Sequence, residues 1–412
     1  MRSTGRTITV DTPNERRQIL VYLSWPLFIL KLLGLLPIFT TQTSYEIGRP
    51  SRRAMLLNRA TLLTKASLNI MHIFTLLSPV MLQLLFIRSH TDGITNMLDI
   101  AFCILSDVTI TWTCARNADK AIIIINSILK VDKLLQKYPG APAERSHATM
   151  NQFTVYLIWM FGFLCLTVVA SIKQTLANFS FYICAHTFSY QLENATSFAF
   201  VVLISALLHQ LAERFRFVNQ LIAQYNCRFL SARVRSRNAL TQDEENLRRF
   251  AESSSIIYSL HVDLLDIYKM INNYAGLGLL AFFLYACTGL LTCTYICSIY
   301  DWVRNEDLYH VLWILLWIPY FAAGLILLTT NCAKATREAN NTSQILARVY
   351  GKGKEYQNII DKFLSKSIKQ DVHFTAYDFF VIDNTTLFKI SSALVTYLVI
   401  LIQFKQLEKS TD

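Results

Sequence analysis

The sequence predicts an all-α membrane protein with seven transmembrane helices and cytoplasmic helical extensions, and three observations carry this prediction. Of the 412 residues, 53% are hydrophobic and only 16% are charged, whereas about 25% of the residues in a typical soluble protein are charged. Apolar runs of about 20 residues recur along the chain, which is the length needed to cross a bilayer core of about 30 Å. The connections between these runs are alternately rich and poor in Lys and Arg, as in a multi-pass protein.

The N-terminal region, residues 1–61, is expected to be cytoplasmic. It begins with a polar, basic segment that lacks the apolar core and cleavage site of a secretory signal peptide. The apolar stretch 18–39 follows and contains Pro26, Pro37 and a central Lys31. Because prolines near both ends and a lysine in the middle disfavour a transmembrane helix, we expect a re-entrant or interfacial segment. The alternative is that this stretch spans the membrane.

The first four transmembrane helices are expected within residues 62–212. Since lipid leaves no water to satisfy an open backbone, each apolar run should be a helix. The connection 175–196 between the third and fourth runs contains no Lys or Arg, so it is predicted to be an outer loop. Asn178 and Asn194 begin N-x-S/T sequons in this loop and are predicted glycosylation sites. The four runs lie near 64–87, 94–114, 152–174 and 197–212.

Two long basic connections, 213–274 and 331–385, are predicted to form cytoplasmic anchor helices. Apolar residues recur at three- and four-residue spacing in 243–274 and in 355–370. This spacing indicates amphipathic helices, the first of which runs into the fifth transmembrane helix. The remaining predicted elements are the fifth and sixth transmembrane helices together, the seventh, and an extracellular tail, in residues 275–330, 386–404 and 405–412.

The charge pattern places the N-terminus in the cytoplasm and the C-terminus outside. The net charge of +11 then reflects basic cytoplasmic loops, and we expect no nucleic-acid partner. A cytoplasmic N-terminus argues against a G-protein-coupled receptor, and the inverted repeats typical of secondary transporters are not evident. The sequence carries no Walker, HExxH or GxSxG motif and no His/Cys ligand spacing. We therefore expect no enzyme, no cofactor and no metal site.

The last apolar run carries the most specific motif. It reads Thr396-Tyr397-Leu-Val-Ile-Leu-Ile-Gln403-Phe404, which matches the TYhhhhhQF signature that closes the insect gustatory receptors, where h is hydrophobic. The segment 31–37 (KLLGLLP) also resembles the N-terminal segment of that family. The length, the cytoplasmic N-terminus and the long basic third cytoplasmic loop are similar too. The chain therefore resembles the insect gustatory receptors over its whole length in architecture, and at its two ends in motif.

This resemblance implies a ligand-gated, non-selective cation channel. The family's relatives assemble as tetramers, so it implies a homotetramer, or a heterotetramer with related receptors, around a central pore lined by four copies of 386–404. The cytoplasmic helical extensions would hold the subunits together, and a small-molecule tastant would bind in an outward-facing pocket among the second to sixth transmembrane helices. The expected location is the plasma membrane of sensory neuron dendrites, in contact with membrane lipid and permeating cations.

On the last helix, Thr396, Ile400 and Gln403 share one face, with Phe404 beside Gln403. In a four-fold bundle, Gln403 and Phe404 would form rings near the outer mouth and Ile400 a ring deeper in the pore. A hydrophobic ring can close a pore by dewetting, and a ring of amides can coordinate ions. We therefore predict that Phe404 and Gln403 form the gate. The alternative is that this face packs against neighbouring helices.

Polar and aromatic residues inside the fifth and sixth transmembrane helices are candidates for the ligand site. Aromatic walls with a few hydroxyl groups would suit an amphipathic organic ligand. Trp313 has the alternative role of an interfacial anchor. The candidates on one face of each helix are Thr288, Thr292, Tyr295, Trp313, Trp317 and Tyr320.

Further candidates lie in the second transmembrane helix and in the outer loop. Asp107 is the only carboxylate well inside the second transmembrane helix, where a charge is costly and needs a role or a partner. It could bind ligand, or it could link helices through hydrogen bonds. Phe102 lies nearer the outside, and Tyr190 and His186 of the outer loop are expected to cap the pocket.

The ligand class is predicted from one position. The sugar-sensing branch of the family tends to carry Glu after the Thr-Tyr pair, where this chain has Leu398. A bitter or other non-sugar tastant is therefore expected. The alternatives are a sugar-type channel, for example for fructose, and a seven-span receptor coupled to G proteins.

Overall fold

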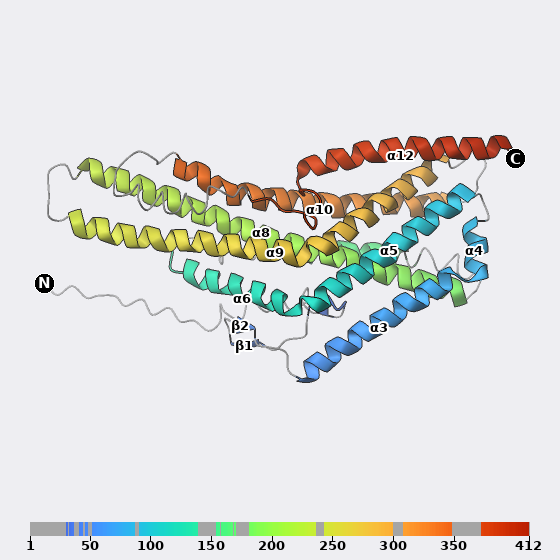
Figure 1. Cartoon of the computed structure of the whole chain (residues 1–412), viewed down its shortest axis with the longest axis horizontal. Coiled ribbons are helices and arrows are strands. Elements are labelled where there is room, and N and C mark those ends of the chain that lie inside the picture. Colours follow the sequence, from blue (N-terminus) through green and yellow to red (C-terminus); the bar gives the residue numbers. More distant parts are fainter. Residues whose placement is uncertain are drawn as a thin grey trace.

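The computed structural model is a bundle of long helices (Figure 1). Most of stretch 18–39, together with Asn178 and residues 355–370, lies outside the described residues. The structure describes residues 30–31, 33–36, 41–43, 46–47, 52–86, 90–138, 154–156, 158–167, 169, 181–235, 243–299, 308–347 and 372–411.

The elements follow one another as two short strands and then helices. The strands β1 (Thr41–Thr43) and β2 (Glu46–Ile47) pair antiparallel. The labelled helices are α3 (Arg52–Leu76), α4 (Pro79–Phe86), α5 (His90–Arg116), α6 (Ala118–Leu135), α8 (Phe181–Arg235), α9 (Asp243–Ile299), α10 (Leu308–Ala347) and α12 (Asn384–Thr411).

Three helices, α8, α9 and α10, form the long axis of the bundle, and α12 lies along one edge of it (Figure 1). The 57 residues of α9 span roughly 85 Å at 1.5 Å per residue, which is far longer than a bilayer core. The prediction that 243–274 is a helix continuous with the fifth transmembrane helix is therefore confirmed.

Five of the described helices are long and apolar enough to cross a membrane. A shorter apolar helix, Thr154–Thr167, falls within the predicted third transmembrane helix. The five segments are His90–Arg116, Phe181–Gln224, Ile256–Ile299, Leu315–Thr342 and Asn384–Glu408.

The predicted first transmembrane helix, 64–87, is two helices in the structure. Helix α3 ends at Leu76 and α4 begins at Pro79. Pro79 has no N–H to continue the ladder of α3, and a proline is favoured in the first turn of a new helix. The Ser78 hydroxyl accepts a hydrogen bond from the Met81 N–H at 3.3 Å, which caps α4.

Helices α8 and α12 extend beyond the predicted fourth and seventh transmembrane segments. Helix α8 begins at Phe181, so most of the expected outer loop 175–196 is helical. The absence of Lys and Arg suggested an outer loop, but in the structure Ser189, Gln191, Glu193 and Asn194 of this segment are buried, whereas Phe181 and Phe188 are exposed. Helix α12 continues to Thr411, so the expected tail 405–412 is also helical up to that residue.

A tight turn attaches the start of α12 to the middle of α9. The Asn272 side chain accepts a hydrogen bond from the Thr375 N–H at 2.8 Å and donates to the Thr375 hydroxyl at 3.1 Å. A Cβ on Gly276 would lie 3.0 Å from the backbone nitrogen of Tyr377, so only glycine lets the turn approach this closely. Asp383 caps α12 by accepting from the Thr386 N–H at 3.0 Å.

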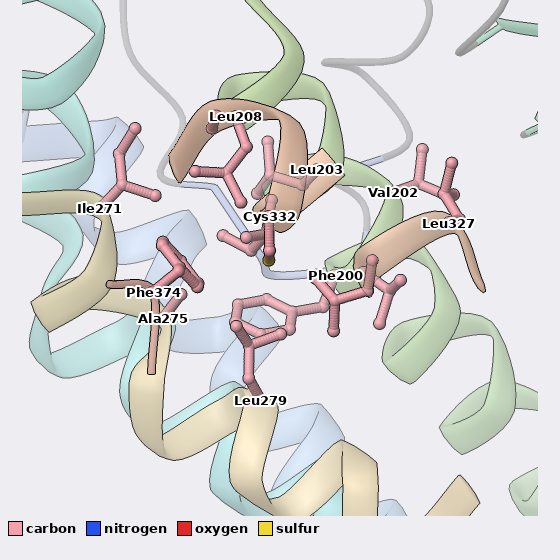
Figure 2. Close-up of a cluster of buried hydrophobic side chains, with 14 of the residues drawn as sticks. Phe200, Val202, Leu203, Leu208, Ile271, Ala275, Leu279, Leu327, Cys332 and Phe374 are labelled. Carbon is pink, nitrogen blue, oxygen red and sulfur yellow. The ribbon is translucent and has the colours of Figure 1, made fainter. Parts of the chain in front are cut away.

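The core lies where α8, α9 and α10 meet, and Figure 2 shows apolar side chains from these helices converging with Phe374 of the turn. A Cβ on Gly278 would lie 2.9 Å from the ring of Phe200. The small residue on α9 therefore makes room for the large one on α8. This packing fixes α8 and α9 relative to each other.

Candidate functional site

The first candidate site is the outward face of α12. None of the residues in its most apolar segment is buried. Thr396, Ile400, Gln403 and Phe404 are all exposed, and Phe404 is 57% exposed. The structure brings the four predicted residues together on a surface that no described part of the chain covers. Their assignment to a pore and gate stays a prediction.

The opposite face of α12 packs on the bundle. Leu387, Ile390 and Leu394 contact the core cluster. The N-terminal end of α12 is held by Asp383, which lies just before the candidate membrane span Asn384–Glu408. Burial acts to raise the pKa of this carboxyl, but hydrogen bonds from Thr385 and Thr386 outweigh it and hold the pKa below its usual value. The capping charge is therefore kept at neutral pH.

The C-terminal end of α12 is fastened by a group of four residues that we call the outer clamp, after the predicted orientation of the chain: Asp92, Tyr295, Lys405 and Glu408. The Lys405 ammonium lies 3.3 Å from Asp92 Oδ2 and 3.7 Å from Glu408 Oε2. The Tyr295 hydroxyl donates to Asp92 Oδ1 at 2.8 Å. Glu408 Oε1 accepts from the His90 N–H at 2.8 Å. The clamp joins α12 to the start of α5 and the end of α9.

Tyr295 was predicted to contact ligand, and the structure places it in this clamp instead. The other two candidates of the fifth transmembrane helix, Thr288 and Thr292, have no contact among the described residues that indicates a ligand site. The Thr288 hydroxyl donates to carbonyls of its own helix, those of Leu284 and Tyr285. Thr292 is buried.

The second candidate site is an aromatic cluster between α8, α9, α10 and the helix Thr154–Thr167. Trp317 and Tyr320, both predicted, are buried at its centre. The ring of Phe163 lies edge-on to Trp317 at 5.4 Å and stacks on Tyr320 at 5.0 Å. We define the aromatic cluster as Phe163, Tyr190, Phe198, Tyr285, Trp317, Tyr320 and Phe321.

Two further predicted residues fall at different distances from this cluster. Tyr190 belongs to it, because its ring lies 5.6 Å from that of Trp317. Tyr190 is therefore a wall residue in α8 and not a loop residue capping the site. Phe102 is half-buried against the hydrophobic core. The side chain of Trp313 lies outside the described residues.

Asn194 is the polar centre of the aromatic cluster. Its amide donates to the Tyr190 carbonyl at 2.8 Å and accepts from the Tyr285 hydroxyl at 2.5 Å. The backbone carbonyl of Asn194 accepts a hydrogen bond from the Tyr320 hydroxyl at 2.8 Å. Because the side chain is fully buried and engaged, the prediction of glycosylation at Asn194 is wrong.

Asp107 is the centre of a buried polar link between helices. The Lys65 ammonium of α3 lies 2.8 Å from Asp107 Oδ1, and the Asn69 amide donates to Oδ2 at 2.8 Å. Lys65 also donates to Thr111 and to Thr196 of α8. Of the two roles expected for Asp107, linking helices is the one for which the structure provides partners.

A second set of buried polar contacts also joins α3 to α8. His72 of α3 contacts Glu193 Oε1 through Nδ1 at 2.6 Å and His186 through Nε2 at 2.8 Å. Sequence reasoning missed the contribution of α3. Lys65, Asn69 and His72 stand at positions i, i+4 and i+7, which is the signature of one helix face, and this signal could have revealed it.

Among the described cysteines, all are free, including Cys184, Cys293 and Cys297 near the outer end. The described residues form no cluster of His, Cys, Asp and Glu suited to a metal ion.

Comparison with known proteins identifies a family and several relatives. The family model described as 7tm chemosensory receptor matches residues 27–408. The gustatory and pheromone receptor 32a of Drosophila melanogaster is 36% identical over 396 residues, which cover 93% of this chain and 85% of that receptor. Gustatory receptor 68a of the same fly is 32% identical over 341 residues, covering 78% and 79% of the two chains.

A solved structure has a similar fold. The insect olfactory receptor OR5 from Machilis hrabei, in complex with eugenol, matches 95% of this chain and 100% of its own, with a TM-score of 0.70 and 11% sequence identity. At this identity the likeness concerns the fold alone.

Proposed function

The chain belongs to the 7tm chemosensory receptor family of insects, and we propose that it is a ligand-gated, non-selective cation channel that acts as a gustatory receptor. It is a multi-pass membrane protein, and neither it nor its family is an enzyme. The proposed assembly is a tetramer, of identical or related chains, with seven transmembrane helices per subunit. The N-terminus would be cytoplasmic and the receptor would lie in the plasma membrane of sensory neuron dendrites.

The observation that carries the proposal is a polar stripe on the exposed face of α12. At 100° per residue, Ser392, Thr396 and Gln403 lie within about 40° of one another, on the side opposite Leu387 and Leu394. Facing lipid, an amide such as that of Gln403 would be unfavourable by about 2 kcal/mol or more. Facing a water-filled pore, it would be hydrated. Four copies of α12 around an axis would supply that environment.

The stripe also supports weak ion selectivity. From Asn384 to Leu407, α12 contains no carboxylate, so a tetramer would have no acidic ring to select among cations. Lys389 is exposed on the same side near the inner end. Phe404, beside Gln403, would form a hydrophobic ring that closes the pore by dewetting.

The proposed ligand is a bitter or other non-sugar compound that binds at the aromatic cluster. Leu398 stands where the sugar-sensing branch tends to carry Glu. The named relative with the higher identity is a gustatory and pheromone receptor, so non-sugar contact signals belong in the same ligand panel. The rings are amphipathic through their hydroxyl groups, which suits a small organic ligand.

Coupling between the two sites is proposed to pass through the outer clamp. Lys405 follows Phe404 directly and is paired with Asp92 of α5. A ligand that moves α5 or α9 at the aromatic cluster would displace the partners of Lys405. This displacement would free the outer end of α12 and open the ring of Phe404.

Patch-clamp recording of the chain in a heterologous cell tests the proposal, with a panel of sugars, bitter compounds and hydrocarbon contact signals. Phe404→Ala should raise the current without ligand, and Gln403→Ala should change relative cation permeability. Phe388→Ala is the control for the loss of an exposed ring, because Phe388 is 77% exposed and lies about 24 Å along α12 from Phe404, away from the proposed gate. Wild-type gating and permeability in both variants would refute the pore assignment.

A further inference from the structure

The region between α3, α5 and α8 holds three carboxylates but only one lysine and no arginine among the residues named here, together with His72 and His186. Asp99, Asp107 and Glu193 lie there, and Lys65 is bonded to Asp107. Glu193 is in contact with His72. Asp99 has no Lys, Arg or His within ion-pairing distance in the part of the chain that the structure describes. Burying a carboxylate has a large free-energy cost unless the charge is paired. The excess of carboxylates therefore favours a cationic ligand.

Asp99 and Glu193 each have one buried carboxylate oxygen without a hydrogen-bond partner among the described residues, but Glu193 contacts His72 through its other oxygen, whereas Asp99 contacts only a hydroxyl. Its Oδ2 accepts from the Tyr190 hydroxyl at 2.9 Å. Its Oδ1 is buried and has no hydrogen-bond partner among the described residues. By contrast, Asp107 is held by Lys65 and by the Asn69 amide. Asp99 therefore has an acceptor that the fold leaves unused.

Aromatic rings stand near this carboxyl group, beginning with Tyr190, whose hydroxyl donates to its other oxygen. The ring of Tyr190, whose hydroxyl touches Asp99, lies 5.6 Å from the ring of Trp317 and 6.0 Å from that of His186. A carboxylate oxygen next to Tyr and Trp rings is the combination that recognises an ammonium group, because the oxygen supplies the opposite charge and the ring faces attract the cation.

We propose that the site takes an amphipathic organic amine. The ammonium group binds Asp99 Oδ1 against the rings of Tyr190 and Trp317, and the apolar body of the ligand lies among the remaining rings of the aromatic cluster. This inference rests on the proposed function, because it names the ligand class of the same receptor site. It goes beyond that function in assigning one carboxylate and one charge to recognition.

The test uses three probes of matched shape: phenylpropylamine, phenylpropyltrimethylammonium and phenylpropanol. The quaternary probe is permanently charged, and the alcohol is neutral. In wild-type channels the two cations should evoke half-maximal current at a concentration at least about thirty-fold below that of the alcohol, since losing a buried charge partner has an effect of this size. In Asp99→Asn this preference should shrink to about threefold or less, with the potency of the alcohol unchanged.

The matched control is Asp119→Asn, the same substitution at an exposed residue at the start of α6, which should keep the thirty-fold preference. If Asp99→Asn fails to reach the cell surface, Tyr190→Phe provides the second variant. It removes the hydroxyl that orients Asp99 but keeps the ring, and it should reduce the preference for the cations selectively.

Equilibrium binding of radiolabelled phenylpropyltrimethylammonium to the purified full-length protein separates the two levels of the proposal. Binding that Asp99→Asn weakens, without any current, supports the amine site and overturns the channel. Currents from wild type that are equally sensitive to alcohol and cations overturn the amine site and leave the channel standing. The amine site is also overturned if protein that reaches the cell surface shows no binding of the probe and no preference for cations.

Discussion

Breaking the outer clamp at Lys405 should make the channel easier to open. At 3.3 Å from Asp92, the ammonium is attracted by roughly 5 kcal/mol at an effective dielectric of about 20. Desolvation offsets part of this attraction. Fully buried pairs lose about 3–5 kcal/mol when one partner is removed. The side chains of Lys405 and Asp92 keep 12% and 11% exposure, so about 2–3 kcal/mol is a reasonable loss for Lys405→Gln.

This loss acts on gating if the clamp holds only the closed arrangement. Each 1.4 kcal/mol changes an equilibrium tenfold, so the open state should gain at least about tenfold per subunit. Patch-clamp recording at matched surface expression should show current without ligand and a fall of at least about tenfold in the half-maximal ligand concentration. Asp92→Asn should act in the same direction. The double variant should fall short of the sum of the single effects, because the two residues share one interaction.

Lys334→Gln is the control for this experiment, because Lys334 forms an ion pair with Glu213 at 2.7 Å away from α12. The reasoning is refuted if Lys405→Gln leaves both basal current and ligand potency unchanged. It is equally refuted if the effects of the Asp92 and Lys405 variants simply add, or if Lys334→Gln has the same effect.

Two further predictions concern buried and pore-facing charge. Lys65→Met should lower surface expression strongly, because it leaves Asp107 buried without its ammonium at a cost of about 3–5 kcal/mol; Lys65→Met combined with Asp107→Leu should restore most of it, and failure to do so would mean that the pair is not what stabilises this region. Lys389→Glu should raise single-channel cation conductance, most clearly at low ionic strength where charge is least screened; an unchanged conductance would remove Lys389 from the ion path.

The sequence predicted best where a single helix carries the signal by itself. Gln403 and Phe404 were selected by the motif of the last apolar run and by helix geometry, which does not require knowledge of the neighbouring helices; their exposure is a finding of the structure. The continuity of 243–274 with the fifth transmembrane helix followed from the same periodicity. Trp317 and Tyr320 were found because they share a face deep in an apolar run.

The sequence predicted poorly where the signal lies in a partner far along the chain. Lys65 meets Thr196 across 131 residues and His72 meets Glu193 across 121, and no local pattern specifies such pairs. The sequon at Asn194 suggested an exposed position. This suggestion failed because a sequon carries no information about burial. Only the packing of α8 against α9 and α10 shows that this amide is enclosed.

The two proposed sites are connected by the geometry of one helix. Asp92 and Asp99 are seven residues apart on α5, which places them on the same face two turns apart, or roughly 10 Å along the axis. An ammonium group bound to Asp99 would therefore act on the same face of α5 from which Asp92 binds Lys405. Because α5 is continuous between the two carboxylates, a displacement at one is carried to the other. Substitution of Asp99 should then change how strongly a cation acts on the channel, whereas substitution of Lys405 should change how readily it opens without any ligand.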